Sequence, residues 1–142
     1  MGVKLLRREE GAALVETALV VPVILLLLFA IFEMGLAFAR YQVLSNASRE
    51  VARIASLFDP ACPTNGGSTP AKDAAIQQTL QQFGGALGMN NGIQIQSIMN
   101  VCRKSESSVV ELRYVHDLPV LDSFIDRASI TLVARTVMRN DF

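Results

Sequence analysis

The sequence is poor in several residue types on which protein chemistry depends. It has no tryptophan, one histidine, two cysteines and two tyrosines. A zinc-type site needs three or four His, Cys or acidic ligands held together, and this supply gives such a site little to build on. The sequence also has no excess of charge of either sign. Thirteen basic residues balance 13 acidic ones, which removes the electrostatic basis for nucleic-acid binding. We therefore expect no metal, no other cofactor and no nucleic-acid partner.

The pattern of a catalytic site is equally hard to find. His116 stands beside Asp117, and Ser123 follows, but their spacing does not support a nucleophile, a base and an orienting acid acting together. The glycine pairs at 66–67 and 84–85 lack the motif of a phosphate-binding loop. We expect a protein that is not an enzyme and has no small-molecule substrate.

Apolar residues, in contrast, are abundant and concentrated near the amino terminus. Between Ala12 and Ala39 the only ionisable side chains are Glu16 and Glu33, near the two ends of the run. The run is long enough to cross a bilayer core of roughly 30 Å at about 1.5 Å per residue. Pro22 would kink such a helix, which membrane helices tolerate. Residues 12–39 are therefore predicted to be a transmembrane helix.

The flanking charges predict the orientation of this helix. Lys4, Arg7 and Arg8 precede the apolar run, which favours a cytoplasmic amino terminus and an exported carboxy-terminal head. A cleaved secretory signal is an alternative, because residues 37–39 (Ala-Phe-Ala) form a small-x-small site. The apolar run is long for such a signal, and Glu33 lies close to that site. The core helix of a soluble protein is disfavoured by the same length.

The amino-terminal pattern resembles a known family. Residues 11–56 read GAALVETALVVPVILLLLFAIFEMGLAFARYQVLSNASREVARIAS, after a charged leader over residues 1–11. This order is similar to prepilins, and the longer string resembles the TadE-like minor pilins of the tight-adherence (Tad) pilus system. The resemblance implies cleavage after Gly11 by an aspartic prepilin peptidase, so that Ala12 becomes the first residue and Glu16 the fifth.

The resemblance also implies roles for the two carboxylates. A carboxylate in a membrane helix is costly, by about 2.5–3.5 kcal/mol at mid-bilayer and less near the interface. In pilins it pairs with the new α-amino group of the same or a neighbouring subunit, here that of Ala12. The alternative is that Glu16 reaches headgroup water. Glu33 is expected to be solvated or paired within the helix, and the family pattern allows it a role in subunit contact.

Beyond the membrane, the helix is predicted to continue over residues 40–58. An apolar stripe at spacings of three and four indicates a face packed on the head; it comprises Tyr41, Leu44, Ser48, Val51, Ala55 and Phe58. Asp59-Pro60 is expected to end the helix. In pilin architecture this half-helix is the spine of the head.

The remaining residues, 59–142, predict a small head. Thr69 and Pro70 are an N-cap and a first helical position for a short helix that is weakened at residues 84–85. Alternating apolar residues predict strands at 92–101, 109–116 and 129–138. In the first strand the apolar positions are Ile93, Ile95 and then Ile98. The expected fold class is α+β, with an antiparallel sheet of about three strands packed on the long helix.

Cys62 and Cys102 are the only cysteines. In an exported head, two cysteines pair more often than they bind metal or act as nucleophiles, and two free thiols are the alternative. We expect a disulfide that ties the loop after the long helix to the end of the first strand.

These expectations combine into one hypothesis with two alternatives. The resemblance implies a minor pilin-like subunit that takes part in assembly or priming of the Tad pilus, in adhesion and in surface attachment. The head is large for a major Tad pilin, which favours the minor role. Its partners would be the membrane, other pilin and minor pilin subunits, the prepilin peptidase and the inner-membrane assembly platform. Its location would be the bacterial inner membrane with a periplasmic head, or an extracellular pilus. The alternatives are an uncleaved, membrane-anchored periplasmic scaffold or binding protein, and a secreted domain released at Ala39.

Overall fold

The computed structural model describes residues 3–63, 67–89, 92–102, 106–123 and 127–140. The chain divides into two compact units, Met1–Gly35 and Leu36–Phe142. Helix α1 (Val3–Ser56) contributes to both of them. The fold class is α+β, as the sequence predicts: a long apolar helix, a short helix and a three-stranded antiparallel sheet.

The first unit consists of the amino-terminal part of α1. The helix begins at Val3 and runs through Pro22 without interruption. All side chains from Gly11 to Phe29 are exposed. The hydroxyl of Thr17 donates a hydrogen bond to the carbonyl oxygen of Ala13 over 2.8 Å, so this polar group is satisfied within the helix.

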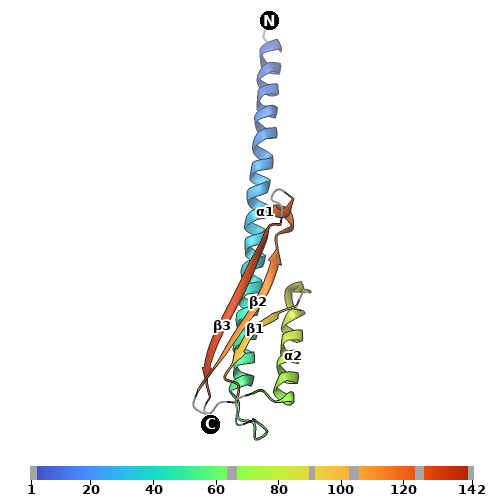
Figure 1. The fold of residues 1–142 in the computed structure, drawn as a ribbon. Coiled ribbons are helices and arrows are strands. Elements are labelled where there is room, and N and C mark those ends of the chain that lie inside the picture. Colours follow the sequence, from blue (N-terminus) through green and yellow to red (C-terminus); the bar gives the residue numbers. More distant parts are fainter. Residues whose placement is uncertain (1–2, 64–66, 90–91, 103–105, 124–126, 141–142) are drawn as a thin grey trace. The chain divides into compact units, whose positions relative to one another are not determined.

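The second unit contains the sheet, in the order β1–β2–β3 (Figure 1). Its strands are β1 (Gln94–Met99), β2 (Ser107–Asp117) and β3 (Ser129–Arg139). The pairing of β2 with β3 is regular along its whole length. The pairing of β1 with β2 shifts register between Ile95 and Ser97. This bulge explains why the apolar spacing in β1 changes from two residues to three before Ile98.

Helix α2 (Pro70–Gly84) begins as the sequence predicts. Thr69 is its N-cap, with its hydroxyl accepting a hydrogen bond from the amide of Lys72, and Pro70 occupies the first turn. The helix ends at the predicted glycine pair, and a single 3₁₀ turn, η1 (Ala86–Gly88), follows it. No pattern in the sequence predicts η1 or the short helix α3 (Pro119–Asp122).

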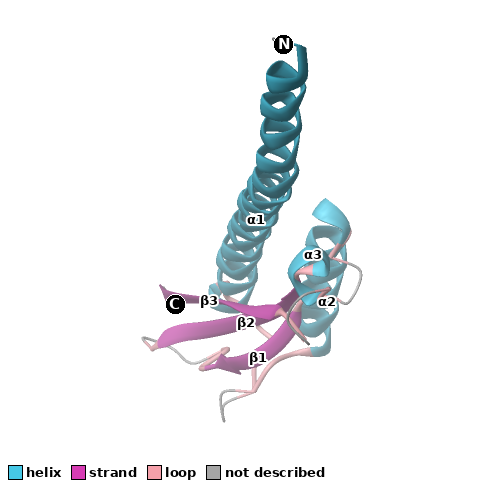
Figure 2. Ribbon diagram, turned by 90° about the horizontal axis from the view of Figure 1, so that it is seen from above, coloured by secondary structure: helices cyan, strands magenta, loops and turns pink. Residues whose placement is uncertain are grey.

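The core of the second unit lies between the helices and one face of the sheet. Figure 2 shows the second-unit part of α1 and helix α2 on the same side of the sheet. The core residues come from all these elements: Leu44, Ala47, Val51, Ala52, Ile76, Leu80, Met89, Val110, Leu112, Tyr114 and Ala134. The alternation predicted for β2 is confirmed, because Val110, Leu112 and Tyr114 are all buried.

The predicted stripe on α1 is correct in its middle and wrong at its ends. Leu44, Ser48, Val51 and Ala55 are buried. The stripe's first and last members, at positions 41 and 58, are 43 % and 68 % exposed. The last position lies beyond the helix, which ends at residue 56 rather than 58, so helical spacing no longer applies to it. Ala47, which the predicted stripe omits, is fully buried.

Candidate functional site

The residues of the expected processing site lie on the amino-terminal part of α1. Gly11, Ala12 and Glu16 are all helical and exposed. A Cβ atom added at Gly11 would meet no other atom within 4 Å, so the fold itself does not require glycine there. Glycine in a helix interior nevertheless weakens the helix by roughly 0.5–1 kcal/mol relative to alanine. The helix is therefore locally easier to unwind at Gly11 than at its apolar neighbours.

The apolar part of α1 has the properties of a membrane span by length and composition. One candidate span occurs in the described residues; it begins at Gly11, and none of its most apolar window is buried within the chain. So many exposed apolar side chains on one helix need lipid or other helices to cover them. The structure is thus compatible with membrane anchoring. The kink at Pro22 remains a prediction.

The burial of Glu33 does not agree with the expectation that its side chain is solvated. Its side chain is 3 % exposed, so it is not solvated. Ala37, four residues later, is also buried, and both therefore lie on the buried side of α1. The alternative expectation, pairing within the helix, is compatible with this burial, because buried carboxylates require polar partners, and it stays a prediction.

The carboxy-terminal end of α1 is held by a lysine from α2. The Lys72 ammonium donates to the carbonyl oxygens of Ala55, over 3.0 Å, and Leu57, over 2.6 Å. These carbonyls belong to the last turn of α1 and the residue beyond it, where intrahelical partners run out. Lys72 is buried, and desolvation lowers the pKa of its ammonium, an effect that nearby Asp59 opposes. The sequence gives no sign of this contact, since lysine is normally found on a solvated surface.

Asp59 organises the loop that follows. Its carboxylate accepts hydrogen bonds from the Thr69 hydroxyl over 2.6 Å and the Ala61 amide over 2.9 Å. These two bonds, the first above all, hold the pKa of the Asp59 carboxyl below its ordinary value, and the charge of Lys72 acts in the same direction. Thr69 therefore links the end of α1 to the start of α2 while it caps α2.

The same region contains a disulfide between Cys62 and Cys102, the pair that the sequence favours. Their Cα atoms are 5.5 Å apart, and 40 residues separate them in the sequence. Cys102 packs with Ala55 and Val101 in a second, smaller hydrophobic cluster. The disulfide therefore joins the loop after α1 to the segment after β1, beside the end of the helix.

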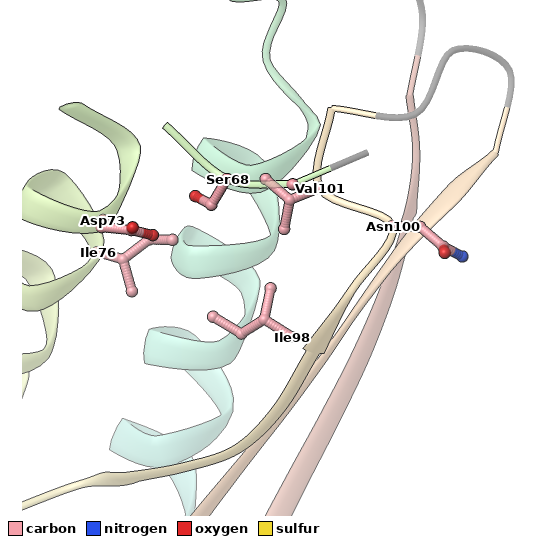
Figure 3. A pocket seen from close by; sticks show the side chains of 7 residues that line it. Ser68, Asp73, Ile76, Ile98, Asn100 and Val101 are labelled. Atoms are coloured by element: carbon pink, nitrogen blue, oxygen red, sulfur yellow. The ribbon is translucent and has the colours of Figure 1, made fainter. Parts of the chain in front are cut away.

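A small pocket of about 280 Å³ lies next to this cluster (Figure 3). Its lining includes Ser68, Asp73 and Ile76 around the start of α2, and Ile98 and Val101 around the end of β1. The Ser68 hydroxyl is buried and has no hydrogen-bond partner among the described residues. The pocket is too small for most organic ligands, and the sequence has no pattern that indicates it.

Another polar cluster lies on the inner side of β2. His116 is buried, and its Nδ1 is hydrogen-bonded to the guanidinium of Arg40. The same guanidinium lies 6.0 Å from the centre of the Tyr114 ring, at the outer limit for a cation–π contact. The strand alternation places His116 on the inner face together with Tyr114, so its burial follows from the predicted pattern. Its pairing with an arginine from α1 does not. Within the described part of the chain, no group of three or more His, Cys, Asp or Glu residues could hold a metal ion.

Comparison with known proteins identifies the amino-terminal segment. Residues 11–53 match the model of the family described as TadE-like protein. This match confirms the resemblance stated from the sequence, and it indicates a protein related to the Tad pilus. It covers Gly11, Glu16, Glu33 and the helix up to Arg53, but none of the sheet. Comparisons with curated proteins and with solved structures give no match.

Proposed function

Because residues 11–53 match the TadE-like family, we propose that this chain is a minor pilin-like subunit that acts in assembly or priming of the Tad pilus. The family match is the observation that carries the proposal, since it begins at the glycine after which a prepilin peptidase would cut. In this proposal residues 1–11 are the leader, 12–39 the transmembrane helix, 40–58 its extracytoplasmic continuation and 59–142 the periplasmic head. Adhesion and surface attachment would follow from pilus assembly.

Processing would change what the helix can bind. Before cleavage Ala12 is an internal residue without a charge, and Glu16 has no amine beside it. Cleavage after Gly11 would create an α-amino group four residues before Glu16, which is one helical turn. A carboxylate in an apolar environment is stabilised strongly by such a charge. A resting membrane protein would thereby become competent to assemble.

The exposed apolar surface of α1 supports a role for this helix in assembly. In the membrane, lipid covers these side chains, and helix association there depends on packing and on polar pairs. A subunit that leaves the membrane must replace lipid by the helices of other subunits. Pilin and minor pilin neighbours, with the inner-membrane platform that moves them, would supply that replacement. An uncleaved periplasmic scaffold with the same anchor is the alternative function.

The test is the mass and the amino-terminal sequence of the protein recovered from cells. We expect the mature chain to begin at Ala12. Gly11→Leu should abolish this cleavage and leave the intact leader, because a bulky side chain would block the peptidase. Gly35→Leu is the matched control, since a Cβ at Gly35 also meets no other atom within 4 Å.

Each alternative predicts a different start. An intact chain beginning at Met1 in wild-type cells would exclude the assembly mechanism based on Ala12 and favour the uncleaved scaffold. A chain beginning at Arg40 would instead indicate a secreted head. Equal processing of Gly11→Leu and Gly35→Leu would show that Gly11 is not the recognised residue.

A further inference from the structure

The outer border of the sheet is formed by β3, and the phase of its hydrogen bonds can be determined. The amide of Leu118 donates to Ala128 just before β3, and the amide of Asn140 donates to Glu106 just after it. The register between these two bonds is unbroken. In an antiparallel ladder hydrogen-bonded and non-hydrogen-bonded pairs alternate. The even-numbered residues of β3 therefore bond to β2, and the odd-numbered ones direct their N–H and C=O groups outward.

The same odd-numbered residues carry the side chains that face away from the helices. We call the surface formed by them the open face of β3: Ser129, Thr131, Val133, Arg135, Val137 and Arg139. All six are exposed, whereas the even-numbered residues are buried or half-buried. The open face is partly apolar, with Val133 at 42 % and Val137 at 57 % exposure.

The two borders of the sheet differ in a way that bears on binding. The strand β1 is short, and its bulge interrupts the pairing, two devices that discourage strand addition. The strand β3 spans Ser129–Arg139 and pairs regularly throughout. Among the described residues no strand pairs with its outer side. A long, regular and unpaired border is a template for an additional strand.

The charged residues on and beside β3 indicate which kind of partner strand could add to it. Arg135 and Arg139 lie on β3, which has no acidic residue. Arg113 on β2 adds a third guanidinium, which donates to the Thr131 hydroxyl over 3.4 Å. Glu111 lies opposite Arg135 on β2, and no ion pair to Arg135 or Arg139 occurs within the described residues. A second copy of β3 would offer these arginines no acidic partner, so charge favours a different strand over self-pairing.

From these observations we propose that the outer edge of β3 is a docking site for an extended strand of another protein in which acidic and apolar residues alternate along one face, that is, at every second position. The acidic side chains would lie beside Arg135 and Arg139, and the apolar ones beside Val133 and Val137. Backbone hydrogen bonds would provide affinity and the alternation would provide specificity. This inference concerns the head alone and does not depend on cleavage after Gly11.

The test uses the full chain in a non-ionic detergent and a dye-labelled peptide in which valine and glutamate take turns at every second position, with threonine at the positions between them. We expect saturable binding by fluorescence anisotropy. N-methylation of alternate peptide amides, or lysine in place of glutamate, should weaken binding by at least about tenfold, because the first removes donors and the second reverses charge. In the protein, Arg139→Glu should abolish the preference for the glutamate peptide over the lysine peptide, because it leaves Arg113 and Arg135 balanced by two acidic residues.

Variants at Val137 separate strand addition from contact with the open face. Val137→Pro removes an outward N–H that the β2 ladder does not use, so the sheet should persist, as checked by amide exchange of Val110 and Leu112. Val137→Ala keeps this N–H. We expect the affinity of the proline variant for the peptide to be at least about tenfold lower than that of the alanine variant.

Three results would overturn the proposal: binding that is indifferent to N-methylation, a charge preference unchanged by Arg139→Glu, or self-association through β3 without binding of the acidic peptide. If Val137→Pro does not fold, the N-methylated peptide still decides between strand addition and simple charge attraction. The processing test reads only the amino terminus, so the two proposals fail independently.

Discussion

At the scale of single residues, the junction between α1 and α2 depends on a few polar side chains. Lys72 donates to two carbonyls at the end of α1, and Asp59 accepts from Thr69 and Ala61. Carbonyls at a helix end that lose a buried partner cost about 1–3 kcal/mol. These few hydrogen bonds therefore hold the start of α2 against the end of α1.

Asp59 gives this junction a pH dependence with a defined sign. Its pKa is lowered in the folded protein, chiefly by the Thr69 hydroxyl. The stabilisation is therefore complete above the ordinary carboxyl pKa of about 3.9 and is lost as the pH falls through the lower folded value. We expect Asp59→Asn to lower the melting temperature at pH 7 and the difference from wild type to shrink below about pH 4. Thermal unfolding in detergent across pH measures this, and a difference that grows toward acid would contradict it.

At the scale of elements, the disulfide connects segments that the core alone holds weakly. It joins the loop after α1 to the segment after β1, where the second hydrophobic cluster is small. Small heads with few strands gain much from such a crosslink, because their cores bury limited apolar surface.

Replacing both Cys62 and Cys102 by serine should destabilise the head. The disulfide bridges residues 40 apart, and a loop of that size contributes up to about 4 kcal/mol in the chain-entropy model. Denaturant unfolding in detergent measures the loss. The reduced wild-type protein is the control, since it lacks the bond but keeps both side chains. A double variant as stable as the oxidised protein would exclude a stabilising role.

At the scale of the whole molecule, the two units have separate chemistry. The first carries Gly11, Glu16 and the exposed apolar helix, and the second carries its own core, disulfide and sheet. A change in the charge of Glu16, whose side chain is exposed, should therefore leave the stability of the second unit unchanged.

Glu16→Gln tests this separation together with the proposed assembly role. We expect normal processing after Gly11 and an unchanged melting temperature of the head. We also expect surface pili to fall by about tenfold or more, the factor that loss of ~1.4 kcal/mol of interaction produces. Immunoblotting of sheared pili gives the measurement. Glu50→Gln is the control, because Glu50 lies on the same helix but pairs with Arg53 in solvent. Normal piliation of Glu16→Gln would exclude the charge pair.

Features that depend on local chemistry could be predicted from the sequence. The apolar helix, the Thr69 cap with Pro70 and the alternation in β2 each follow from residues a few positions apart. The sequence shows that the spacing of apolar residues changes before Ile98, and the bulge in β1 explains this change. The stripe on α1 failed at Tyr41, because helical spacing gives the direction of a side chain but not where the opposing surface ends. It failed at Phe58 because the helix ends before that residue.

The sequence by itself determined the class of fold, the membrane-type helix, the cysteine pair and the family resemblance, since each is encoded in composition or short-range order. Only the tertiary structure decided which polar groups are buried together, such as Lys72 with the end of α1 and Arg40 with His116. It also decided which border of the sheet remains open. These contacts join residues far apart in the chain, and their partners depend on how the elements pack.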